Sequence, residues 1–385
     1  MPFANPQSAA EPPLQPLIDD LDPAAALPGG EVELSGVNLG PVNSALPSAL
    51  PSALLSVQTS ALPSVQTSVR PSVQPSVRPS VLPSVLVDGL PAQVLMSRPS
   101  RLVFRVPDEA MTGLVEVRNS AGDSNAVPLR VAHRLSDGLH SVTNPAVSRS
   151  GMIYATISGP RGKQTPVSVV RISPDGRGTP LVTDILNATG LAFNPGGDLF
   201  VTSRAEGNVY RVDAAGESTV YAEGMGVATG LAFDAEGNLF VGDRSGTIFK
   251  INPERQIFVY ATLEPSVAAY HLAVGAEGTL YVTGPTLSSN DAIWAIDTHG
   301  DARAWYRGLG RPQGLALDRE GNVFLAACLQ GRRGLVRVTP QGDATLVVAG
   351  ASLVGLAFSP LGTTILATGD AVYDVDLGVE GLNLF

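Results

Sequence analysis

The stretch TGLAFNPGGDLFVTSRAEGNVYRVDAAGESTVYA (189–222) decides the fold, because the chain repeats it. A second copy, TGLAFDAEGNLFVGDRSGTIFKINPERQIFVYA, begins at Thr229, and a third, QGLALDREGNVFLAACLQGRRGLVRVTPQGDATLVVA, begins at Gln313. More divergent copies complete a series of six units spaced by 40 to 46 residues. In chain order, units one to six begin at Thr143, Thr189, Thr229, Tyr270, Gln313 and Val354.

Each unit contains four short apolar runs separated by turn residues. In unit three these runs are GLAF, LFVGD, TIFKIN and QIFVYA. Four strands in about 40 residues are typical of one blade of a β-propeller. A solenoid is the alternative, but the absence of a polar capping repeat favours a closed ring.

The turns of the units share a glycine at the fourth of five places, as in NPGGD (194–198) and DAEGN (234–238). Glycine supplies there the positive φ of a bulged hairpin. Unit three has Arg255 at this place in its second such turn, at an expected cost of about 1 kcal/mol. The turn chemistry therefore predicts tight hairpins along one face of the ring.

The composition of the 385 residues agrees with short strands and turns, since it includes 41 Gly and 31 Pro. A net charge of −10 argues against a general nucleic-acid binder. The single cysteine, Cys328, excludes an intrachain disulfide and a cysteine-cluster metal site, and it is expected to be a buried apolar side chain. The sequence shows no signal peptide and no apolar run long enough to span a bilayer, so we expect the protein in the cytoplasm, with no membrane partner.

A second, smaller module is predicted over residues 14–132, after a flexible tail at 1–13. Its alternating runs EVEL, AQVLM, RLVFRV, LVEVRN and AVPLRV indicate a small antiparallel sandwich. A near-tetrapeptide Pro-Ser-Val repeat at 44–85 interrupts it, and repeated proline predicts a disordered or polyproline-like insertion. This insertion is either a functionless expansion of a tolerant loop or a Pro-rich ligand for a partner.

Two family resemblances follow from these residues. The first module resembles the immunoglobulin-like IPT/TIG family in GVNLG, VDGLPAQVL, RLVFRVP and VEVRNSAGDSNAVPLRV, which implies an interaction or spacer module. The units over 133–385 resemble NHL-repeat propellers and the gluconolactonase or senescence-marker-protein family, with GLALDREGNVFLAACLQGRRGLVRVTPQGD the most similar blade. The predicted fold is thus all-β, an immunoglobulin-like sandwich plus a six-bladed propeller of four-stranded blades.

Functional residues are expected at the top face, defined as the face where the first strand of each unit begins and where the loop after its second strand lies. In the metal-dependent lactonases that the units resemble, Glu, Asn and Asp at these starts hold one divalent cation. Here Thr143, Tyr270 and Gln313 stand at those places. Because hard cations need several oxygen ligands, mostly anionic, no metal ligand, catalytic residue or cofactor is predicted.

The predicted function is a non-enzymatic binding or scaffold protein that uses the top face for an unknown protein or small-molecule ligand. The alternative is a gluconolactonase-like metal-dependent lactone hydrolase, in which His271 would act as acid or base; a structural role for this lone histidine is the competing interpretation. We also expect the sandwich beside the top face near units one and six, with a ligand cleft lined by Tyr270, His271, Gln313, Arg204 and Arg244. The candidate ligand-binding residues are Thr143, Thr189, Arg204, Thr229, Arg244, Tyr270, His271 and Gln313.

Overall fold

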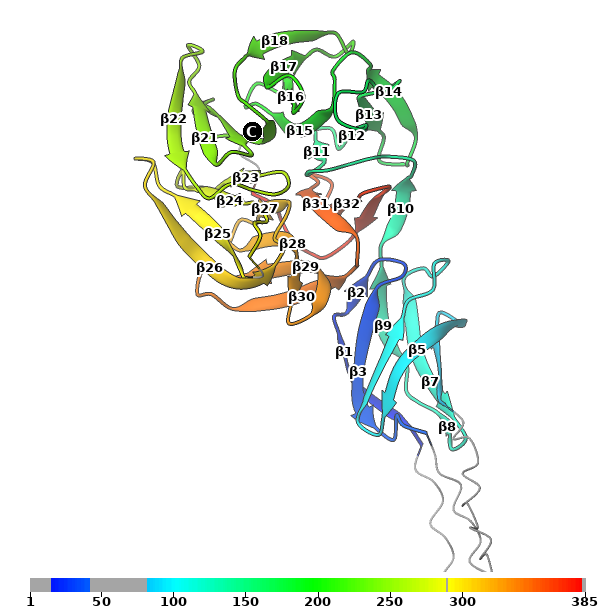
Figure 1. The fold of residues 1–385 in the computed structure, drawn as a ribbon. Helices are drawn as coiled ribbons and strands as arrows, with labels where there is room; N and C mark the ends of the chain where they lie inside the picture. Colours follow the sequence, from blue (N-terminus) through cyan, green and yellow to red (C-terminus); the bar gives the residue numbers. More distant parts are fainter. Residues whose placement is uncertain (1–14, 42–81, 289, 383–385) are drawn as a thin grey trace, which may run out of the picture.

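The computed structural model describes residues 15–41, 82–288 and 290–382. Regular structure in these ranges is entirely β, and they contain no helix of the length and apolarity that crossing a membrane requires. The predicted tail at 1–13 and most of the Pro-Ser-Val repeat lie outside the described residues. A ring of sheets forms one part of the molecule, and a smaller N-terminal part adjoins it (Figure 1).

Units one, two and three each form a separate four-stranded antiparallel sheet. Their strands pair in sequence order, as expected for consecutive hairpins. Unit one contains β11 (Ala146–Val147), β12 (Ile153–Thr156), β13 (Val169–Ile172) and β14 (Gly178–Val182). Unit two contains β15 (Ala188–Phe193), β16 (Leu199–Ser203), β17 (Asn208–Val212) and β18 (Ser218–Ala222). Unit three contains β19 (Ala228–Phe233), β20 (Leu239–Asp243), β21 (Thr247–Ile251) and β22 (Ile257–Thr262).

Units four and five depart from this separation. They belong to one 17-stranded sheet, because Leu309 in unit four pairs with Leu329 in unit five. Within each unit the strands still pair in order. Unit four contains β23 (His271–Val274), β24 (Leu280–Thr283), β25 (Asp291–Ile296) and β26 (Ala302–Gly310). Unit five contains β27 (Leu315–Leu317), β28 (Val323–Leu329), β29 (Arg332–Val338) and β30 (Ala344–Ala349).

Unit six closes the ring by combining both ends of the repeat region. Its inner strands β31 (Leu353–Phe358), β32 (Thr364–Thr368) and β33 (Val372–Val375) come from the end of the chain. The outermost strand is β10 (His133–Ser136), which precedes unit one and pairs with β33. The resulting arrangement is propeller-like, and the closure that the sequence left undetermined is made by these two strands.

Glycines have two roles in the ring: some allow adjacent units to approach closely, and others make the hairpin turns. The Gly of each TGLAF run lies against the next unit: a Cβ on Gly190 or Gly230 would stand 2.3 Å from the carbonyl oxygen of Thr229 or Tyr270. In the hairpin turns, Gly237 has the predicted positive φ, at 84°, and Arg255 adopts the same region with φ 66°. The predicted turn chemistry, with its one strained arginine, is confirmed.

The N-terminal part consists of two groups of antiparallel strands whose apolar faces share one core. One group pairs in the order β1 (Leu17–Asp22), β3 (Glu31–Val37), β6 (Arg101–Arg105) and β5 (Leu90–Arg98). The other contains β4 (Ser84–Val87), β7 (Gly113–Asn119), β8 (Gly122–Asp123) and β9 (Val127–Val131), and β4 also pairs with β5. A two-residue turn at Asp88 and Gly89, with φ of 48° and 80°, makes the β4–β5 hairpin expected from VDGLPAQVL.

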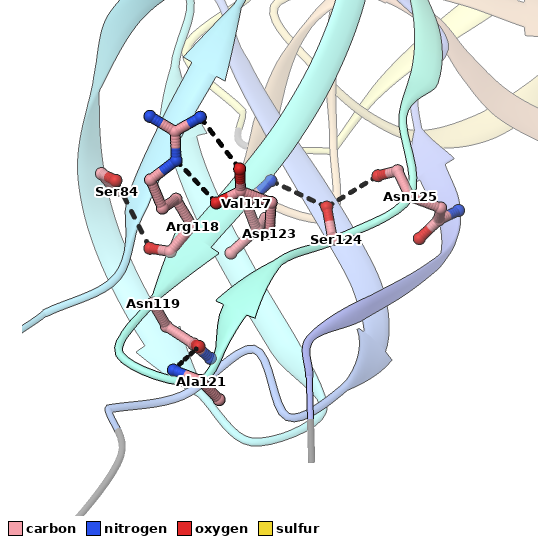
Figure 2. Close-up of polar contacts among 8 residues, drawn as sticks. All are labelled: Ser84, Val117, Arg118, Asn119, Ala121, Asp123, Ser124 and Asn125. Carbon is pink, nitrogen blue, oxygen red and sulfur yellow. Dashed lines mark hydrogen bonds and ion pairs between the residues drawn. The ribbon is translucent and has the colours of Figure 1, made fainter. Parts of the chain in front are cut away.

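The predicted end of the insertion, residue 85, is wrong. Ser84 and Val85 belong to β4, where they pair with Arg118 and Val117. Figure 2 shows the Ser84 hydroxyl donating to the Arg118 carbonyl, next to the Arg118–Asp123 ion pair. Val85 is fully buried. The last copy of the Pro-Ser-Val motif matches the repeat in sequence, but its valine is buried in the core and the segment forms a strand.

The N-terminal part docks on units five and six. The sequence analysis predicted units one and six, so the prediction is wrong for unit one. The short strand β2 (Ala25–Ala26) pairs in parallel with both β9 and β30. Next to it, the side chain of Leu27 packs into the apolar core between units five and six. Arg332 in unit five also forms an ion pair with Asp22. The two parts are therefore joined by a continuous sheet as well as by the connecting chain.

Candidate functional site

The residues at the top-face strand starts form a ring of hydrogen bonds from unit to unit. The Thr143 hydroxyl donates to the Thr189 carbonyl over 2.6 Å, and the Tyr270 amide donates to the Thr229 hydroxyl over 3.0 Å. Between units four and five, the Thr283 hydroxyl donates to the Gln313 carbonyl over 2.6 Å. These contacts bring the starts of adjacent units together, as predicted for residues of one face.

Asn144 completes this ring across the channel. Its Nδ2 donates to the Leu315 carbonyl over 2.8 Å, and its Oδ1 accepts the Leu356 amide over 3.2 Å, so unit one is joined to units five and six. Below Asn144 the central channel opens as an apolar cavity of about 180 Å³. Leucines from five inner strands line it: Leu191, Leu231, Leu272, Leu356, and both Leu315 and Leu317 of β27.

The donors at the strand starts do not fit a divalent cation. The threonines of the first three units offer only neutral hydroxyl oxygens, and these are buried. Each is also held in place by its own hydrogen bond: Thr143 to the Thr189 carbonyl, Thr189 to the Asn187 carbonyl over 2.9 Å, and Thr229 to the Gly242 carbonyl over 2.9 Å. In the described part of the chain, no three His, Cys, Asp or Glu side chains are grouped to hold a metal ion. A hard cation requires several free oxygen ligands, most of them anionic.

Tyr270 and His271 are buried, with exposed fractions of 2% each. The Tyr270 ring packs against Gly242 and Gly284, and its hydroxyl donates to the Glu264 carbonyl. Burial, with smaller contributions from Glu264 and Asp243, raises the pKa of Tyr270 to about 12. Desolvation lowers the pKa of His271 to about 3, so its imidazole is neutral at pH 7.

Arg204 and Arg244 occupy equivalent positions directly after β16 and β20. The backbone amide of each donates over 3.3 Å to the start of its own unit, at Asn187 and Val227 respectively. The Arg204 Nη2 donates to the Gly159 carbonyl over 2.9 Å, and the Arg244 Nη2 donates to the Val267 carbonyl over 2.8 Å. Each half-buried guanidinium is thereby fixed at the top face by the loop of a neighbouring unit.

The charges of these arginines are not neutralised within the described residues. Neither guanidinium forms an ion pair there. The Nε atoms of both are buried and have no hydrogen-bond partner in the same residues. Desolvation lowers the pKa of Arg204, and the nearby positive charges of Arg244 and Arg161 lower it further. Three cationic side chains from units one, two and three thus share one region.

Asn187 is a residue of this region that the sequence analysis missed. It is buried, has a positive φ of 49°, and lies two residues before the start of unit two, at the place where unit three has Val227. Its Nδ2 donates to the carbonyls of Gly159 and Pro160, and its Oδ1 accepts the Gly162 amide over 2.7 Å. Asn187 therefore fixes the loop that carries Arg161. Asparagine tolerates this backbone region better than most residues, which was the available clue.

A cleft of about 740 Å³ does lie between the N-terminal part and the ring, but its lining differs from the prediction. It is formed by β3 and β6 on one side and by the top loops of units five and six on the other. None of Tyr270, His271, Gln313, Arg204 and Arg244 lines it. The difference follows from docking at β30, away from the arginines of units two and three.

The comparisons with known proteins support the fold. No family model and no curated protein matches the chain. A solved structure named as a gluconolactonase shares 20% identity with a TM-score of 0.55, covering 66% of this chain and 93% of that one. A gluconolactonase from Xanthomonas campestris shares 15% identity with a TM-score of 0.53, covering 69% and 89%.

The whole chain also has a structural counterpart. A Bacteroides thetaiotaomicron protein of unknown function shares 13% identity with a TM-score of 0.52, covering 96% of this chain and 100% of that one. At these identities the likenesses show the fold alone. The chain is thus an all-β, propeller-like protein similar in structure to gluconolactonases.

Proposed function

We propose that this protein binds a small organic molecule at the top face of its propeller, and that lactone hydrolysis is the activity to test first. The observation that carries the proposal is the pair of equivalent, partly desolvated arginines, Arg204 and Arg244, held in place beside the ring of strand starts. Polar groups fixed in advance on a rigid scaffold are characteristic of ligand sites.

The comparisons favour this proposal over a protein scaffold. The solved structures of similar fold include gluconolactonases, enzymes of small-molecule metabolism, and nothing in the comparisons supports the scaffold interpretation. The metal-dependent form of lactonase chemistry does not fit the threonine-rich strand starts, however. We therefore place no reaction step through a cation.

We also propose the finer architecture. The strand pairings within units four and five support counting them as two blades, which makes six blades with units one, two, three and six. The two strand groups of the N-terminal part support an IPT/TIG-type sandwich over 14–132, followed by the propeller over 133–385. Thr143, Thr189, Thr229 and Gln313 shape the mouth of the propeller, whereas Tyr270 and His271 support it from inside.

The test measures binding and hydrolysis separately. The full-length protein is assayed for hydrolysis of δ- and γ-lactones, and its melting temperature is measured in the same solutions. Both measurements are made once with a chelator and once with calcium, zinc or manganese. We expect stabilisation by a lactone or its hydroxy-acid product in the chelator, and no saturable metal binding by calorimetry. Micromolar metal affinity together with metal-dependent hydrolysis would overturn the assignment.

A further inference from the structure

Three arginines lie in the top-face region over units one to three, and neither Arg204 nor Arg244 forms an ion pair within the described residues of this protein, whose net charge is −10. Arg161 lies in the top loop of unit one, Arg204 after β16 and Arg244 after β20. Like charges placed together destabilise a fold and are found mainly where a ligand supplies the opposite charge. The acidic remainder of the chain already provides solubility, so the arginine cluster needs another explanation.

The hydrogen-bonding capacity of these side chains is largely unused. A guanidinium carries five N–H donors. Arg204 uses one on Gly159 and Arg244 uses one on Val267, and both buried Nε–H groups lack a partner in the described residues. Protein atoms enclose the two Nε–H groups, so a ligand with acceptor oxygens would engage the remaining Nη donors of the two guanidinium groups.

The cluster is also held rigidly before any ligand arrives. The Gly159 carbonyl accepts hydrogen bonds from both Arg204 and Asn187, so the loop of unit one and the arginine of unit two form a single network. On the other side, the Ser266 amide donates to the Arg244 carbonyl over 3.1 Å. Preorganised donors lose little conformational entropy on binding.

We propose that Arg204 and Arg244, assisted by Arg161, bind the oxyanion group of a small organic molecule, either a carboxylate or a phosphate ester. This inference rests on the proposed function, and it specifies the ligand class. Planar guanidinium forks match both carboxylate and phosphate oxygens through paired N–H···O bonds.

The experiment is calorimetric titration of the full-length protein with three probes: gluconate, its uncharged analogue glucitol, and inorganic phosphate. Arg204→Gln and Arg244→Gln remove one charge each. Arg303→Gln is the matched control, because Arg303 is exposed on β26 and the change in net charge is the same. Thermal melts of each variant verify folding, and Arg204→Lys tests the fork geometry should Arg204→Gln not fold.

We expect gluconate to bind the unaltered protein, glucitol to bind at least about tenfold more weakly, and each Gln variant at Arg204 or Arg244 to lose about tenfold in affinity for gluconate. Arg303→Gln should retain the original affinity. Binding of phosphate but not gluconate, with the same variant pattern, would support the site and select a phosphate ester as its ligand.

Equal binding of gluconate and glucitol would overturn the inference while leaving small-molecule binding intact. Gluconate binding that survives both Arg204→Gln and Arg244→Gln would contradict the assigned residues. Conversely, binding of an oxyanion at these arginines without any response to lactones would support the inference and remove lactone hydrolysis from the proposed function. No binding of either gluconate or phosphate would contradict the oxyanion site.

Discussion

The Leu27 amide donates a hydrogen bond of 2.8 Å to the Ala349 carbonyl, so the N-terminal part continues the sheet of unit five. The Leu27 side chain is 3% exposed and fills the core between units five and six. The two parts should therefore move as one body, unlike domains joined only by a linker.

Substituting Gly30 should separate the two parts. In Gly30→Ala, the added Cβ would stand 2.5 Å from the Ala349 carbonyl oxygen and 2.9 Å from that of Leu27. Both are backbone atoms, which cannot avoid the clash by changing rotamer. We expect small-angle scattering to show a broader distance distribution than for the unaltered protein. Gly369→Ala is the control, because no heavy atom lies within 4 Å of its added Cβ. An unchanged distribution for Gly30→Ala would contradict the docking arrangement.

Arg255 should reveal the backbone strain of its turn. Its guanidinium lies 5.0 Å from the centre of the Tyr221 ring and donates to the Tyr221 carbonyl, which offsets its positive φ. Arg255→Ala loses these contacts and keeps the strain, whereas Arg255→Gly loses the contacts and relieves it. Denaturant unfolding should show the Gly variant more stable than the Ala variant by about 1 kcal/mol. Equal stabilities would show that the turn is not strained.

His271 should make stability depend on pH. Because burial lowers the pKa of His271 from 6.5 to about 3, only the unfolded chain binds the proton between these pH values. The contribution of His271 is complete above pH 6.5 and is lost as the pH falls, by roughly 2 kcal/mol at pH 5. Denaturant unfolding of His271→Gln should show a flatter pH dependence between pH 7 and 5. Parallel profiles for both proteins would mean that the imidazole is accessible to protons in the folded state.

The boundary of the insertion can be tested with two deletions. Replacing residues 44–81 by a short Gly/Ser linker should leave the melting temperature nearly unchanged, since long surface insertions contribute little to stability. Extending the deletion to residue 85 removes Ser84 and the fully buried Val85 from β4, and should lower the melting temperature by more than about 5 °C. A comparable fall with the shorter deletion would show that the repeat itself packs.

The all-β fold and the repeating units could be predicted because their determinants are local. Alternating apolar runs and the glycines at 197 and 237 specify strands and turns without reference to distant residues. Ring closure by β10, the joining of units four and five, and docking through Leu27 depend on pairings between residues far apart in the sequence. Periodicity within a unit carries no information about those pairings.

The candidate site was predictable to a similar extent. The repeat placed Arg204 and Arg244 on one face, because they follow equivalent strands. The burial of Tyr270 and His271 was not predictable, since it depends on the space left by Gly242 and Gly284 in neighbouring strands. The role of Asn187 depends on its backbone conformation and on a loop of another unit, neither of which a single sequence displays.

A crystal structure of the full-length protein grown with gluconate and a chelator would show whether a small molecule binds beside Arg204 and Arg244 without a divalent cation. We expect gluconate density on the top face, with its carboxylate within hydrogen-bonding distance of both guanidinium groups. Gluconate bound instead in the cleft beside the N-terminal part, or in the apolar channel below Asn144, would contradict it.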